Sequence, residues 1–165
     1  MIRYVTLGAL ALFPVFLAAN AEAQSKEYEL AQLVNERKRL MYDLERADWV
    51  LLDVRNGKSP DFDGAAAAAS KMASSIVQFS SLLLPDTARG AAPGSRAKPE
   101  VWSESEEFGV AVAAFQERAS QFAQVATRQN LEEYTVEFEA FTSACTTCHG
   151  FRPSSGGRFR YAINE

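Results

Sequence analysis

The stretch Cys145-Thr146-Thr147-Cys148-His149 decides how the rest of this 165-residue chain is interpreted. Its spacing, C-x-x-C-H, is typical of covalent haem attachment, in which each cysteine forms a thioether and the histidine offers a ring nitrogen to the iron. Residues three apart on a helix lie on nearly the same face, so both sulfur atoms reach one edge of the macrocycle. The motif therefore predicts one haem c, held by Cys145 and Cys148, with His149 as an axial ligand.

The composition argues against other uses of these cysteines. The chain contains two cysteines and one histidine, and all three lie in the motif. A zinc site of Cys and His ligands needs four of them. A thioredoxin-like C-x-x-C needs a βαβ context, and nothing near the motif has the pattern of a strand. A disulfide between the two cysteines is the remaining alternative, and it would close only a very small loop.

The N-terminus has the pattern of an export signal. A short positive start at residues 1–3 is followed by an apolar run from Tyr4 to Ala19. Ala21-Glu22-Ala23 supplies the small-x-small cleavage pattern, which predicts removal of residues 1–23, and a second such pattern covers residues 19–21. An uncleaved membrane anchor is the alternative, but the run is shorter than the roughly 20 apolar residues that a spanning helix needs. We expect a periplasmic protein without stable membrane insertion.

The net charge says little about specific partners but argues against nucleic acids. The removed segment holds one arginine and one glutamate, so the mature chain keeps the net charge of −4. A mildly acidic protein is a poor candidate for nucleic-acid binding. The mature chain has the length of a single domain, and a covalently held cofactor suits an exported protein.

Four helical stretches and no convincing strand follow the signal. Apolar residues recur in them at helical spacing, and capping and breaking residues mark their ends. Ser103 and Glu106 have the spacing of a capping box. The expected helices are 26–55, a second from Asp61 or Asp63 to about residue 84, a third from Ser103 to about 126, and a fourth from Asn130 to His149. This pattern predicts an all-α antiparallel four-helix bundle over residues 24–152, with the haem-attachment motif at its C-terminal end.

The fourth helix carries the motif on its apolar face. Tyr134, Phe138 and Phe141 form a stripe that Cys145 and Cys148 continue. The two cysteines should therefore face the interior, and we expect the haem to lie among the four helices.

Two segments lie outside the helical pattern. The loop at 85–101 is longer than most unstructured connections, so it either covers part of the site or is a mobile surface crossover. Residues 153–165 are expected to form a flexible tail, with Arg158 and Arg160 and little else to anchor it. Trp102 is expected to cap the end of the bundle with apolar area, and Trp49 to lie in the core.

The second face of the iron needs a cover from elsewhere, because no second histidine exists. Met72 lies in a seam with alanines and is expected in the core, which leaves Met41 in the first helix. Arg37 lies one turn before Met41 on the same face, and an arginine beside apolar positions needs a partner, such as a haem propionate. We expect Arg37 at a propionate and Met41 near the second face. The alternatives are core packing for Met41 and a solvated position for Arg37 in the charged run 36–39.

These motifs together resemble the cytochromes c′ and the related cytochromes c-556, which are four-helix bundles with a C-terminal C-x-x-C-H. The resemblance covers the whole mature chain. It rests on Arg37-x-x-Leu40-Met41, on Gly57-x-x-Pro60, on Arg96-Ala97-Lys98-Pro99-Glu100-Val101-Trp102 and on Cys145 to His149.

The resemblance implies covalent haem with His149 as the proximal ligand, Met41 in the distal position and Arg37 near the propionates. In cytochromes c′ the distal residue packs beside a five-coordinate iron that admits NO and CO, whereas in c-556 proteins a methionine there ligates the iron. Arg37 looks like the first branch, and Leu40-Met41 looks like the second, as does Leu84-Pro85-Asp86. The family usually has an arginine four residues after the histidine, and here Arg152 stands three after it, before a proline.

We expect a periplasmic monohaem electron carrier that is not an enzyme. A five-coordinate protein that binds NO or CO is the alternative. A haem peroxidase is the least favoured function, because the second face offers no histidine as an acid–base group. The resemblance implies a homodimer formed through the first two helices, and electron transfer implies a redox partner protein that the sequence does not identify.

Overall fold

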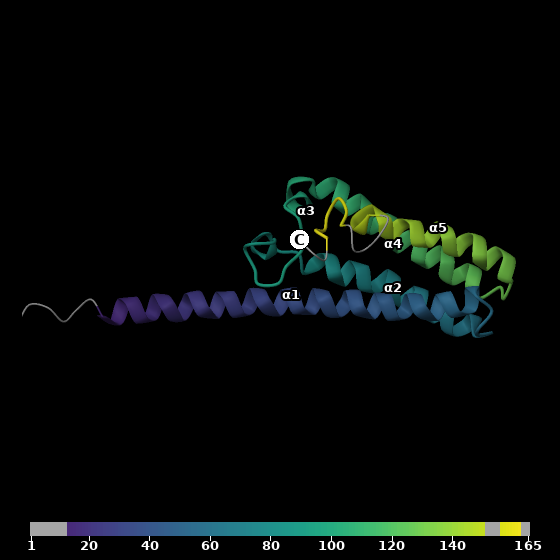
Figure 1. Cartoon of the computed structure of the whole chain (residues 1–165), viewed down its shortest axis with the longest axis horizontal. Coiled ribbons are helices and arrows are strands. Elements are labelled where there is room, and N and C mark those ends of the chain that lie inside the picture. Colours follow the sequence, from purple (N-terminus) through teal and green to yellow (C-terminus); the bar gives the residue numbers. More distant parts are fainter. Residues whose placement is uncertain (1–12, 151–155, 163–165) are drawn as a thin grey trace, which may run out of the picture.

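Four long helices, each antiparallel to the next along the chain, make up most of the chain that the structure describes (Figure 1). The computed structural model describes residues 13–150 and 156–162. Its helices are α1 Phe13–Arg55, α2 Phe62–Ser81, the 3-10 helix η1 Pro85–Thr87, α3 Glu100–Ser103, α4 Ser105–Ala126 and α5 Leu131–His149. Within the described residues, only isolated bridges occur in place of a sheet. The all-α four-helix bundle predicted from the sequence is confirmed.

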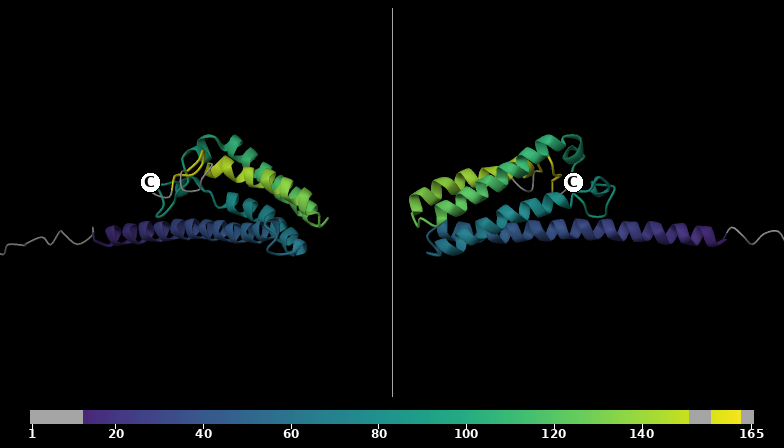
Figure 2. Two further views of the ribbon diagram at one scale, coloured as in Figure 1. Left: turned by 45° about the vertical axis from the view of Figure 1, so that its right-hand side comes forward. Right: turned by 180° about the vertical axis from the view of Figure 1, so that it is seen from behind.

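The core lies between two helix pairs, α1 with α2 and α4 with α5 (Figure 2). The small side chains of Ala65 and Ala69 on α2 are completely buried, which lets the backbones approach closely. On α4, Phe122 is fully buried, and its ring centroid lies between 4.7 and 6.1 Å from those of three aromatic residues of α5: Tyr134, Phe138 and Phe141. This aromatic group holds α5, the helix that carries the motif, against α4.

The ends of three helices are where the sequence predicts them. α1 ends at Arg55, and Gly57 follows with a positive φ of 67°, a conformation that glycine adopts without strain. The Asp61 carboxylate accepts a hydrogen bond from the amide of Gly64, which caps α2. The side chain of Asn130 caps α5 by accepting from the first two amides beyond Leu131.

Two other sequence predictions are wrong. Ser103 does not cap the third long helix: it is the last residue of α3, and α4 begins at Ser105 after Glu104, whose side chain makes no capping bond. Trp49 is not in the core, because 59% of it is exposed. The prediction for Met72 is confirmed, since only 3% of this side chain is accessible.

The N-terminal signal lies partly outside the described residues. Residues 1–12 are not described, and α1 runs without interruption from Phe13 past the predicted cleavage position before Gln24. In the described part of the chain, no helix combines the length and the apolar character that crossing a membrane requires.

The described part of the C-terminal tail is anchored, contrary to the sequence prediction. The ring of Phe159 is 3% exposed and packs in a second apolar cluster with Val101 and Ala111. Its carbonyl accepts a hydrogen bond from the Lys98 amide (3.1 Å), and the Tyr161 amide donates to the carbonyl of Arg96 (3.0 Å). The loop at 85–99 and the tail at 156–162 therefore form one layer, which we call the cap.

Candidate functional site

The two cysteines lie at the C-terminal end of α5, on the face that turns inward. Both are half-buried, and neither forms a disulfide. Cys145 packs against the main core, whereas Cys148 packs against the second apolar cluster, beside Trp102 and Phe159. The stripe that continues from Phe141 through the cysteines is therefore present as predicted.

The protonation of the motif fits covalent haem better than a thiolate metal site. Burial raises the pKa of the Cys145 thiol to about 12, with a contribution from the Asp48 carboxylate, and it raises the pKa of Cys148 to about 11. A thiolate would be unfavourable in such surroundings, while an uncharged thioether is compatible with them. Burial also lowers the pKa of His149 to about 4, with help from Arg160, so the imidazole is neutral at pH 7, the form that ligates iron.

Two interactions show how α1 and α5 lie along one another. The Arg55 guanidinium of α1 lies 5.5 Å from the centroid of the Phe138 ring of α5. One level along, Asp48 of α1 acts electrostatically on Cys145 of α5. Both steps are seven residues long, in opposite chain directions, which agrees with the antiparallel course of the two helices (Figure 1).

The same antiparallel course extends to the end of α5. From Cys145 to His149 is four residues, or about 6 Å along the helix axis. From Asp48 back to Met41 is seven residues, or about 10 Å in the same direction. Seven residues are nearly two turns, so Met41 shares the face of α1 that carries Asp48. Met41 therefore lies on α1 toward the end of the bundle that holds His149.

The environment of Met41 agrees with this placement. Its side chain is half-buried and packs against the main core, the cluster that Cys145 also contacts from α5. The other methionine among the described residues, Met72, is buried inside the core. Met41 is thus the methionine whose sulfur can face a group bound beside Cys145.

Arg37 is buried, which rules out the solvated alternative. Only 5% of the residue is exposed. Its guanidinium donates to the hydroxyl of Thr87 (2.9 Å), to the carbonyl of Thr87 (3.0 Å) and to the hydroxyl of Ser95 (3.2 Å). Burial lowers its pKa to about 10, so the side chain keeps its charge at neutral pH. Its role at a propionate stays a prediction, and its observed role is to hold the loop of the cap onto α1.

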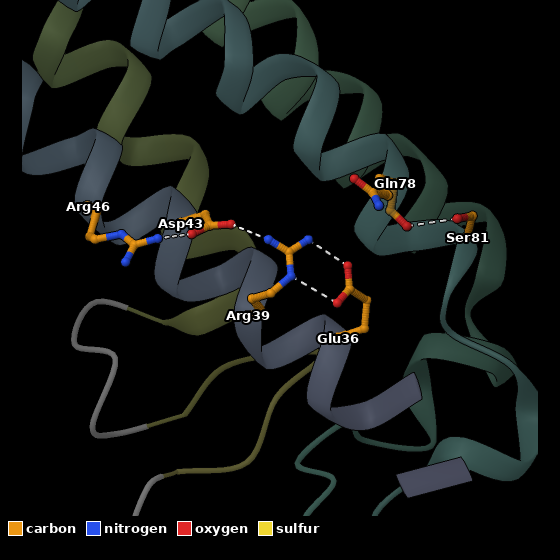
Figure 3. Close-up of polar contacts among 6 residues, drawn as sticks. All are labelled: Glu36, Arg39, Asp43, Arg46, Gln78 and Ser81. Atoms are coloured by element: carbon orange, nitrogen blue, oxygen red, sulfur yellow. Dashed lines mark hydrogen bonds and ion pairs between the residues drawn. The ribbon is translucent and has the colours of Figure 1, made fainter. Parts of the chain in front are cut away.

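Arg39, the other arginine of the charged run 36–39, lies on the surface. Figure 3 shows Arg39 on the outer face of α1, between Glu36 (2.6 Å) and Asp43 (2.7 Å). Arg46 pairs with the same Asp43. In this view, Gln78 and Ser81 of α2 are joined through the Gln78 carbonyl. Because Arg39 is satisfied by neighbours three and four residues away, these pairs belong to the surface, and the inward Arg37 is the exception in the run.

The tail lies directly against the motif. A side chain at Gly157 would collide with the backbone of Cys148, His149 and Gly150, so glycine is needed for this close approach. The Lys98 ammonium donates to the Gly157 carbonyl (2.7 Å), which fixes the tail to the loop. Sequence reasoning missed these contacts, and also Thr87 and Ser95, because they join segments with no shared pattern.

Arg152, which stands three residues after His149 where the family usually has an arginine four after it, lies outside the described residues. Arg160, on the folded-back tail, is close enough to His149 to help lower the pKa of its imidazole. The described residues contain no cluster of three or more His, Cys, Asp or Glu side chains that could hold a separate metal ion.

Comparison with known proteins agrees with this arrangement of a bundle and a terminal motif. The sequence model of the family described as cytochrome C′ matches residues 32–152. A search of the curated proteins gives no match. The chain therefore belongs to the cytochrome c′ family and is a haem protein of the c type, and the family expected from the sequence is confirmed.

Solved structures share the fold. One is a carbon monoxide-bound variant of cytochrome c prime from Alcaligenes xylosoxidans, which is 20% identical over 78% of this chain and 94% of that one, with a TM-score of 0.64. Another is the nitric oxide complex of a further variant of that protein, 20% identical over 80% of this chain and 96% of the other, with a TM-score of 0.66. At this identity the likeness concerns the fold.

The contact between Arg37 and the cap generates a test. Thr87→Val removes a hydroxyl acceptor and leaves a buried charge less satisfied, so it should lower the free energy of unfolding by about 1–3 kcal/mol. Urea unfolding followed by circular dichroism measures this. The matched control is Thr127→Val on the exposed end of α4, which should change stability by less than about 0.5 kcal/mol. Equal effects at the two positions would contradict a structural role for the Arg37 contact.

Proposed function

We propose that this protein is a periplasmic monohaem electron carrier in which His149 and Met41 are the two axial ligands of a haem bound to Cys145 and Cys148. The observation that supports it is that Met41 of α1 and Cys145 of α5 pack against the same core cluster. When bound, the haem supplies the one-electron Fe(III)/Fe(II) couple. No substrate is converted, so the proposal is a carrier and not an enzyme.

Four residues of the chain have a defined role in this proposal. The two cysteines hold the cofactor at the end of α5 through uncharged thioethers, which suits their burial. The neutral imidazole of His149 offers a lone pair without first losing a proton. The thioether of Met41 is also a neutral ligand, and methionine ligation raises the reduction potential of a His-ligated haem. The apolar clusters beside both cysteines exclude water, so the charged iron centre would have little contact with solvent.

An open site that binds NO or CO is the second candidate. Two solved structures with the same fold are described as bound to carbon monoxide and nitric oxide. Methionine has three rotatable bonds, so the side chain of Met41 can turn away from the iron. The two candidates differ in one bond, the bond between the Met41 sulfur and the iron.

The export and attachment parts of the proposal share one measurement. Mass spectrometry of protein released from the periplasm should give the mass of a chain that begins at Gln24 plus one haem. Cys145→Ser and Cys148→Ser should each leave one thioether, and the double variant should lose the haem in acidified solvent. A full-length mass, or haem that stays on the double variant, would contradict this part of the proposal.

The ligand on the second face is tested by Met41→Leu. Optical spectra of the wild type should show the sulfur-to-iron charge-transfer band of the oxidised state and no CO binding in the reduced state. Leucine has similar volume and no donor atom, so the variant should become high-spin and bind CO.

Met72→Leu is the matched control, because this methionine is closed inside the core. Its spectrum should equal that of the wild type. A high-spin wild-type spectrum with ready NO binding would replace the carrier by the gas-binding function. An unchanged spectrum in Met41→Leu would remove Met41 from the site.

A homodimer through α1 and α2 is part of the same proposal. Three aromatic residues are exposed along α1, Tyr28, Tyr42 and Trp49, at intervals of fourteen and seven residues, so they share one face. Trp49→Asp should convert a sedimenting dimer into a monomer at micromolar concentration. Val110→Asp, on exposed surface of α4, is the control and should leave the dimer intact. A monomeric wild type would refute the dimer without touching the haem assignment.

A further inference from the structure

The cap gathers cations around one aromatic ring. The Arg89 guanidinium lies 4.5 Å from the centroid of the Tyr161 ring, and the Lys98 ammonium lies 5.2 Å from the same centroid. Arg96 is held in this layer because its carbonyl accepts from the Tyr161 amide (3.0 Å). Two cations therefore lie within reach of one ring, and such a gathering of positive charge is unusual in a protein whose net charge is −4.

Two carboxylates at this end of the bundle are paired with other cations. Asp86 forms an ion pair with Lys26 (2.8 Å), and Glu104 forms one with Arg158 (2.7 Å). Of the residues that the structure describes, none forms an ion pair with the three cations Arg89, Arg96 and Lys98. Their charge is therefore not balanced by salt bridges within the described chain.

Two further carboxylates, of Glu27 and Glu100, lie close to the three cations in sequence or in space, but neither forms an ion pair with them. Glu100 is half-buried, and one of its oxygen atoms is buried without a hydrogen-bond partner, so it points inward. Glu27 of α1 and Arg89 both line a shallow hollow of about 440 Å³. No ion pair joins these two residues, and Arg89 is an exposed residue.

The cationic layer lies next to the attachment motif. The Lys98 ammonium is hydrogen-bonded to the carbonyl of Gly157 (2.7 Å), and the backbone of Gly157 rests on Cys148, His149 and Gly150. A molecule that docks on the outer face of the cap is thus separated from the end of α5 by little more than one layer of chain. That proximity is what an electron-exchange surface needs.

We propose that Arg89, Arg96 and Lys98 form a basic docking surface for an acidic electron-transfer partner protein. The proposal rests on the carrier function and names the chemistry of its partner. The net charge of −4 repels an acidic protein from most of the molecule, and the three cations attract it at one place, beside the motif. Such an arrangement both raises the association rate and selects the orientation.

Small redox reagents of opposite charge test the field at this surface. We would measure by stopped flow the rate constants for reduction of the oxidised holoprotein by the anionic iron(II)–EDTA complex and by cationic hexaammineruthenium(II). The anionic reagent should slow as ionic strength rises, because salt screens the attraction. At low ionic strength, Arg96→Gln should slow the anionic reagent about threefold and Arg89→Gln/Arg96→Gln about tenfold. With both of these variants, the cationic reagent should react at least as fast as it does with the wild type.

The matched control is Lys71→Gln, which removes one positive charge from the exposed face of α2, ten residues before the end of that helix. It should change neither rate by more than about 1.5-fold. A fall in the anionic rate equal to that of Arg96→Gln would show a general charge effect and overturn the proposal. Equal losses for both reagents would also overturn it, because a merely structural change would slow both.

Poly-L-glutamate serves as a probe for an acidic macromolecular surface. At low ionic strength it should shift the amide NMR signals of the cap in the reduced holoprotein, and the double variant should lose these shifts. Failure to bind the wild type, or equal binding to the double variant, would overturn a protein-docking surface. The carrier function is judged separately, by the optical spectrum. A high-spin wild type would refute it, while the reduction rates would still report on the electrostatic field at the cap.

Discussion

The hydrogen bond from the Tyr134 hydroxyl to the Leu51 carbonyl (2.9 Å) joins the last helix to the first inside the core. Both residues are completely buried, so breaking this bond would leave two polar groups without water. It ties the start of α5 to the last two turns of α1, at the end of the bundle away from the motif. The antiparallel course of α5 from this point brings the motif back along α1, toward the level of Met41.

The helices could be read from the sequence because each depends on local information. Apolar spacing, Asp61 and Asn130 at helix starts and Gly57 beyond α1 predicted the elements and their inward faces. The family and the haem motif were likewise predictable, since five consecutive residues carry the chemistry. The failure at Ser103 has a local cause as well: α3 takes up this serine as its last residue, so α4 starts two residues later.

The cap could not be predicted in the same way. Arg37 is fifty residues from Thr87, and Lys98 is fifty-nine from Gly157, and no periodicity links such pairs. The sequence predicted only that an inward arginine needs a partner. That partner within the chain is a pair of neutral hydroxyls and a carbonyl from a loop. For Trp49 the sequence predicted too much contact: its large aromatic surface predicted burial, but its position on the outer face of α1 keeps it in solvent.

The close approach of Gly157 to the motif also bears on the order in which parts of the chain fold. The helices and their hairpins form through contacts between near neighbours, whereas the pairing of residues 96–98 with 159–161 closes a loop of about sixty residues. Long loops close late because their entropy must be overcome before any contact stabilises them. The end of α5 is therefore covered last. Until the segment 156–162 closes, the two thiols stay accessible to solvent, so the last step of folding is the one that covers the motif.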